Sequence, residues 1–118
     1  MKVLCVDDEI GIRKVITRMY SKDNEVYTAE NGEVGLEVAR AKRPNLILLD
    51  HDMPLMNGDI FYEHLCEDPR IRHIPIVAIG DFSADMLKKF PAHVAKPFDK
   101  PNLDLAIERA LASKEPLI

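Results

Sequence analysis

The feature that most constrains the fold of this chain is a regular alternation between two hydrophobic periods. Short apolar runs rich in valine, isoleucine and leucine lie at residues 2–6, 25–29, 46–49, 76–79 and 93–95. Several runs are nearly continuous, which is typical of strands buried on both faces of a parallel sheet. Each run is followed by a segment whose apolar residues have helical spacing. The sequence therefore predicts the order strand–helix, repeated five times.

Strands that alternate with helices predict right-handed crossovers, with helices on both faces of one sheet. We therefore expect an α/β fold, a three-layer doubly wound (βα)5 domain with a five-stranded parallel sheet. Asn31, Ser83 and Asp8 have the chemistry of helix N-caps, and Pro101 suits a first helical turn. Pro91 ends any helix that begins near Ser83, so the fourth helix should be shortened to about two turns or be irregular.

Charge and length narrow the classes of function. The net charge is −4 and no run of lysine or arginine stands out, so we expect no direct binding to nucleic acid or to a membrane. The apolar stretches are far shorter than the roughly 20 residues that cross a bilayer, and the N-terminus has no leader pattern, so we expect a cytoplasmic protein. Cys5 and Cys66 lack metal-ligand spacing and are expected to pack rather than to form a disulfide. The length suits a single domain, 1–118.

Charged residues follow three of the predicted strands, at the edge where open α/β sheets bind their ligands. Asp7 and Asp8 follow the first strand, Asp50 ends the third, and Lys96 follows the fifth. Neighbouring carboxylates repel one another unless a cation is present, and Mg²⁺ prefers carboxylate, water and phosphate oxygens. Taken singly, each aspartate is better explained by a turn or a helix cap than by a metal site. Together, the four residues predict Mg²⁺-dependent phosphoryl transfer to an aspartate.

Five segments carry a resemblance to a known family over essentially the whole chain. They are residues 3–9 (VLCVDDE), residues 46–54 (LILLDHDMP), Gly58, residues 74–77 (IPIV) and residues 96–98 (KPF). In this order and spacing they resemble the receiver domain of bacterial and archaeal response regulators. The resemblance implies a flavodoxin-like sheet with the strand order 2-1-3-4-5.

Carried over to matching positions, the resemblance assigns a role to each residue of the edge. Asp50 is the expected phosphoacceptor and also a metal ligand. Asp8 is expected to bind Mg²⁺ directly, Asp7 through water, and Asp52 through its backbone carbonyl. The remaining member, Lys96, is expected to contact the phosphoryl group.

The resemblance also implies a cis peptide bond at Pro97 and a set of partners. A sensor histidine kinase or a phosphotransfer protein would donate the phosphoryl group, and an effector protein or domain would respond to it. The domain would act as a signalling switch that catalyses only its own phosphorylation and dephosphorylation, rather than as a metabolic enzyme. Whether it forms a homodimer stays open.

Two positions depart from the family pattern. Receivers usually have threonine or serine at the end of the fourth strand, where this chain has Gly80, and an aromatic residue on the fifth strand, where it has His93. Two hypotheses follow. Either phosphorylation is retained and Ser83 or the backbone amide of Asp81 replaces the missing hydroxyl, or the domain is a phosphorylation-independent pseudo-receiver used for protein docking. For the Asp52 side chain, a role beside the attacking water and a plain solvated position are both open.

Three other classes fit the sequence less well. Residues 50–52 (DHD) resemble the motif of haloacid-dehalogenase phosphatases, but the order of the acidic motifs is reversed and the chain has no room for the later ones. A nucleotide or flavin site needs a phosphate-binding loop after the first strand, where residues 7–9 are acidic. A histidine metal site would need paired ligand spacing, which is missing from His51, His64, His73 and His93.

Overall fold

The sheet has the predicted architecture in the computed structural model, which describes residues 1–113. Five strands pair in parallel in the order β2-β1-β3-β4-β5, which confirms the predicted α/β fold and its 2-1-3-4-5 order. Each strand coincides with one of the apolar runs, and β5 begins one residue earlier than expected. The strands are β1 (Lys2–Val6), β2 (Glu25–Ala29), β3 (Leu46–Asp50), β4 (Ile76–Ile79) and β5 (Ala92–Val94).

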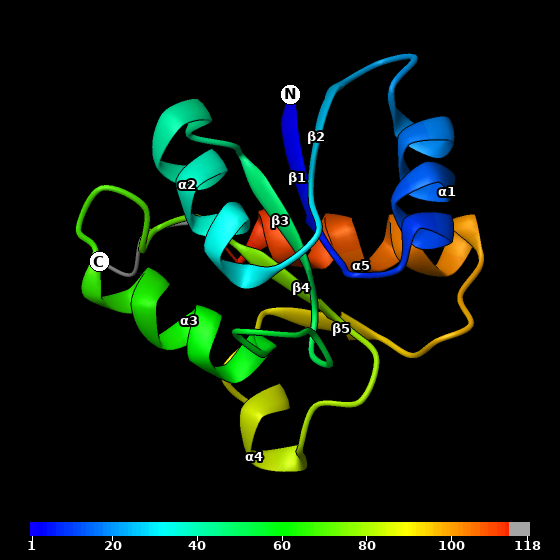
Figure 1. Ribbon diagram of the computed structural model, residues 1–118. Coiled ribbons are helices and arrows are strands. Elements are labelled where there is room, and N and C mark those ends of the chain that lie inside the picture. Colours follow the sequence, from blue (N-terminus) through cyan, green and yellow to red (C-terminus); the bar gives the residue numbers. More distant parts are fainter. Residues whose placement is uncertain (114–118) are drawn as a thin grey trace.

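Four long helices cover the two faces of this sheet, and a short one lies at its edge (Figure 1). The first pair, α2 and α3, packs on one face, and α1 and α5 pack on the other. This arrangement gives the three layers of a doubly wound domain. The helices are α1 (Ile10–Tyr20), α2 (Gly32–Lys42), α3 (Gly58–Glu67), α4 (Ala84–Leu87) and α5 (Lys100–Ala112).

The central strand β3 explains why its apolar run is continuous rather than alternating. All five of its residues are buried. Ile47 and Leu49 pack into the core beneath α2 and α3, whereas Leu46 and Leu48 pack into the core beneath α1 and α5. A strand that contributes to two cores must be apolar on both faces, and this is the habit of parallel sheets.

Most of the predicted helix caps are present in the structure, and one is not. The side chains of Asn31 and Ser83 accept hydrogen bonds from backbone N–H groups and cap α2 and α4. The cap expected of Asp8 is wrong, because Glu9 holds the N-cap position of α1 and its side chain makes no capping bond. The fourth helix is shorter than the two turns expected, with the four residues Ala84–Leu87.

The two cysteines are free thiols, as expected, but only Cys5 is a buried packing residue, and Cys66 is exposed. Within residues 1–113, no helix combines the length and the apolar character that a bilayer-spanning segment needs.

Candidate functional site

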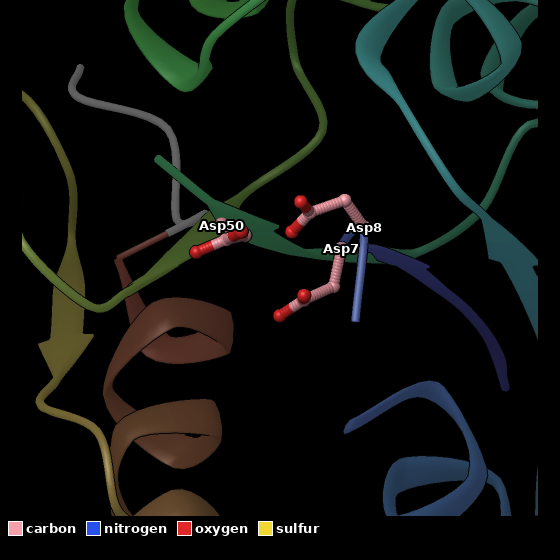
Figure 2. Close-up of side chains that lie close together, drawn as sticks. All are labelled: Asp7, Asp8 and Asp50. Atoms are coloured by element: carbon pink, nitrogen blue, oxygen red, sulfur yellow. The ribbon is translucent and has the colours of Figure 1, made fainter. Parts of the chain in front are cut away.

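The three aspartates predicted to act together do meet at the carboxyl ends of β1 and β3 (Figure 2). Oxygen atoms of Asp7, Asp8 and Asp50 lie within 4.8 Å of one another. Asp7 is only 1% exposed and Asp50 5%, whereas Asp8 is open to solvent. Two buried carboxylates at this separation repel each other, so the cluster needs positive charge to stay ionised.

Lys96 supplies one positive charge to this cluster. Its Nζ atom lies 3.1 Å from Asp50 Oδ1 and 3.0 Å from Asp7 Oδ2. The peptide bond to the following Pro97 is cis, as expected. Nζ also lies 3.1 Å from Glu9 Oε1, a contact that the sequence analysis missed. The only signal for Glu9 was its place directly after the two aspartates.

The charges of the cluster change the acidity of its members. Burial raises the pKa of the Asp50 carboxyl to about 6, and the charge of Asp7 adds to this effect while Lys96 opposes it. Burial alone lowers the pKa of the Lys96 ammonium, but its contacts with Asp7, Asp50 and Glu9 outweigh burial and raise that pKa overall. Lys96 therefore stays charged at neutral pH, yet it does not fully offset three carboxylates.

The aspartate cluster still lacks positive charge, and a divalent cation would supply it. Within residues 1–113, Asp7 Oδ2 has no partner in hydrogen-bond geometry, and its close contact is the ion pair with Lys96 Nζ at 3.0 Å. One ammonium group shared among Asp7, Asp50 and Glu9 leaves the buried carboxylates short of positive charge, which a bound cation would supply. The all-oxygen donor set of Asp7, Asp8 and Asp50 suits Mg²⁺.

The Asp7→Asn substitution is expected to weaken Mg²⁺ binding by about 10–100-fold, the usual effect of losing an outer-sphere group that orients a metal site. Asparagine keeps the shape of the side chain but removes its charge. Isothermal titration calorimetry with Mg²⁺ measures the change. Asp23→Asn is the matched control, because Asp23 is exposed at the far edge of the sheet, before β2. Equal affinities in the two variants would place the ion elsewhere.

Gly80, at the expected switch position, faces the acceptor without a side chain. A Cβ atom built on Gly80 would lie 3.5 Å from Asp50 Oδ1 and 3.9 Å from the Cδ atom of the Lys96 side chain. Its φ of +97° lies in the left-handed region, which favours glycine. Its N–H is already donated to the Val94 carbonyl, at 3.0 Å. The other expected switch residue, His93, lies exposed on β5.

A small cavity of about 120 Å³ opens between the acceptor and the loop after β4. Of the two substitutes proposed for the missing hydroxyl, Asp81 lines this cavity, whereas the Ser83 side chain caps α4. The exposed Asp52 side chain also borders it. The cavity is therefore rich in carboxylates, and its complete lining is Glu9, Asp50, Asp52, Gly80, Asp81 and Lys96.

His51, directly after the acceptor, holds the loop around Asp52. Its Nδ1 lies 2.9 Å from Asp52 Oδ1, and its Nε2 lies 3.3 Å from Asp59 Oδ2 on α3. Burial lowers the pKa of His51, but the bonds to both aspartates outweigh it and raise the pKa. The imidazole also packs edge-to-face on Phe82, with ring centroids 4.8 Å apart. The spacing of the histidines, which argued against a metal site, gave no indication of this clamp.

The aromatic contact of His51 continues along the loop after β4. Phe82 packs edge-to-face on Phe90 at 5.0 Å, and Phe90 packs on Tyr62 of α3 at 4.9 Å. Edge-to-face aromatic pairs at these separations are favourable beyond the area they bury. The loop that carries Gly80 is thus anchored by Phe82, which is buried against the acceptor loop.

Known proteins resemble this chain in sequence and in fold. The sporulation initiation phosphotransferase F of Bacillus subtilis is 33% identical, over 96% of this chain and 95% of that protein. A probable transcriptional regulator, ycf27 of Cyanophora paradoxa, is 35% identical over 97% of this chain but only 49% of its own length. The crystal structure of the chemotaxis protein CheY4 of Vibrio cholerae superposes with a TM-score of 0.84 at 28% identity, covering 93% of this chain and 98% of that one.

A family model that matches most of the chain identifies its family. The model of the response regulator receiver domain matches residues 3–108, a range that includes the three aspartates and Lys96. Fold, site geometry and sequence similarity therefore agree, and the chain belongs to the response regulator receiver domain family.

Proposed function

We propose that this receiver domain accepts a phosphoryl group on Asp50 in a Mg²⁺-dependent manner and acts as a signalling switch. The observation that carries the proposal is the meeting of Asp50 with Asp7 and Asp8 within 4.8 Å and with Lys96 at 3.1 Å. Such a site combines a nucleophile, a cation site and a fixed ammonium group, which are the parts that phosphoryl transfer needs.

The proposed step is an in-line displacement at phosphorus. A carboxylate oxygen of Asp50 forms a new P–O bond, while the P–N bond to the donor's phosphohistidine breaks. The released imidazole nitrogen takes the electron pair of that bond and then a proton from water. Lys96 holds a phosphoryl oxygen, since its Nζ already lies beside Asp50 Oδ1. The three aspartates and the backbone carbonyl of Asp52 would hold Mg²⁺, which would supply positive charge against the phosphoryl oxygens.

The partners follow from this chemistry and from the relatives. We propose a sensor histidine kinase or a phosphotransfer protein as the donor and an effector protein or domain as the recipient of the signal. The names of the relatives, a sporulation phosphotransferase and a probable transcriptional regulator, support signalling partners of this kind. The domain is then the substrate and partial catalyst of its own modification rather than a metabolic enzyme.

One observation favours a second function. Gly80 has no hydroxyl for a phosphoryl oxygen, and its φ of +97° makes a threonine there unfavourable. A receiver without this contact could dock partners without phosphorylation. The intact acidic cluster and Lys96 support the first function, because keeping like charges buried together costs stability and would bring no benefit to a docking module.

The intact mass of the protein after incubation with acetyl phosphate or phosphoramidate tests the proposal. We expect a phosphoryl adduct with Mg²⁺ and none in EDTA, and peptide mapping should place the adduct on Asp50. An adduct on another residue, or one independent of Mg²⁺, would contradict the assigned site. No adduct from these donors or from a panel of histidine kinases, in protein shown to bind Mg²⁺, would favour the docking function.

A further inference from the structure

A second cavity lies at the other end of the sheet from the aspartates. Its volume is about 370 Å³, and it lies between α3 and the segments that lead into β4 and β5. Pro75, directly before β4, and Pro91, directly before β5, both line it. In a parallel sheet the amino ends of the strands are opposite their carboxyl ends. The cavity is therefore separate from the phosphoacceptor site.

The charge around this cavity is opposite in sign to that of the whole protein. Arg72, Lys88 and Lys89 line it, and none of its described lining residues is acidic. Arg72 and Lys89 make no ion pair within residues 1–113, and Lys88 has only a 4.0 Å contact with the exposed Asp85. Three cations therefore gather around one hollow in a chain of net charge −4. Such a local reversal of sign favours an anionic partner.

Part of the cavity wall is made of packed aromatic side chains and prolines. Phe90 is 7% exposed, and its ring packs edge-to-face on Tyr62 at 4.9 Å. The two prolines add rigid apolar surface beside these rings. Apolar and aromatic pockets rimmed by polar residues are where the anchor side chains of protein partners are buried. The cavity thus combines a patch of aromatic and proline side chains with a cationic rim.

We propose that this cavity docks an acidic peptide segment of a partner protein. An apolar or aromatic side chain of the segment packs on Tyr62 and Phe90, and its carboxylates face Arg72, Lys88 and Lys89. Nucleic acid suits the site less well, because it requires a basic stripe along a surface rather than three cations around one hollow. The proposal goes beyond phosphoryl acceptance and does not depend on it.

Fluorescence anisotropy tests the docking with the unphosphorylated chain of 118 residues. The probe is a short fluorescein-labelled peptide of glutamates with one central phenylalanine, and the control peptide has glutamines instead. We expect the glutamate peptide to bind, and its binding to weaken as salt increases. The double variant Arg72→Glu/Lys89→Glu should lower the affinity by about tenfold or more. Both side chains are exposed, so the variant should fold, and circular dichroism verifies this.

The matched control is Lys22→Glu, an exposed lysine before β2, at the opposite edge of the sheet. This variant should bind the peptide like the wild type. Equal losses in both variants, equal binding of the glutamine peptide, or no binding at all would overturn the proposal. NMR shift changes on binding should include Tyr62 and Phe90, and changes confined to other surfaces would also overturn it. Self-association that the double variant abolishes, without peptide binding, would assign the cavity to a second copy of the chain instead.

Discussion

Replacing Asp50 with asparagine is expected to abolish the phosphoryl adduct and, in EDTA, to make the folded protein more stable at pH 7. The first effect follows because asparagine has no carboxylate oxygen to attack phosphorus, and the loss should exceed about 100-fold. The second follows because Asp50 is buried beside Asp7, and both burial and that charge disfavour its ionised form. Asparagine is uncharged and escapes this penalty.

The pH dependence of the second effect has a definite sign. The folded-state pKa of Asp50 is about 6, above the roughly 3.9 of an unfolded aspartate. Between these values the folded state binds more protons than the unfolded state, so wild-type stability falls as pH rises from about 4 to about 6. The variant lacks this fall. At pH 7 it should gain about 1–2 kcal/mol, which is less than the full shift implies because solvent reaches the edge of the site.

Urea denaturation in EDTA at pH 4 and pH 7 measures the change in unfolding free energy. The gain should be present at pH 7 and nearly absent at pH 4. Asp23→Asn is the matched control, since Asp23 is exposed before β2, at the far edge of the sheet, and its variant should keep both the adduct and the wild-type pH profile. A variant Asp50→Asn that is less stable than the wild type at pH 7 would contradict the electrostatic argument.

Phe61→Ala is expected to destabilise the fold by about 3–5 kcal/mol. Phe61 is 0% exposed on α3 and packs closely against α2, where a Cβ built on Gly35 would lie only 3.0 Å from its ring. Truncation leaves a cavity that the tightly packed helices cannot fill. Ile60 is the preceding residue of the same helix but is 41% exposed, so Ile60→Ala should cost about 1 kcal/mol or less. Chemical denaturation of both variants measures the difference, and similar losses would mean that the α2–α3 interface is not the tight contact described above.

The sequence allowed the fold and most of the site to be predicted, because both depend on periodic or local signals. Parallel strands buried on both faces leave continuous apolar runs, and β3 is the clearest case, with all of its residues buried. Strand order places the carboxyl ends of β1 and β3 side by side, so Asp7, Asp8 and Asp50 could be brought together before any coordinates were known.

The contacts that could not be predicted depend on side-chain direction or on exact loop paths. Glu9 meets Lys96 across 87 positions, and the sequence around Glu9 does not indicate which way its side chain turns. The clamp made by His51 needs α3 to begin where Asp59 can reach it. The Asp8 cap failed because α1 starts one residue later than the cap required, with Glu9 at its N-cap. Each error follows from a shift of one residue or one rotamer, to which hydrophobic periodicity is insensitive.

The positive φ at Gly80 also limits how this domain can evolve. A threonine there is not reached by exchanging a side chain alone, because a residue with a Cβ in the left-handed region is disfavoured by about 1–2 kcal/mol. Rotating the peptide would disturb the bond from the Gly80 N–H to the Val94 carbonyl, which joins the ends of β4 and β5. A change of Gly80 to threonine therefore costs stability unless a second substitution in the loop offsets it. The hydroxyl of the family pattern is thus not restored here by a single exchange without cost to the fold.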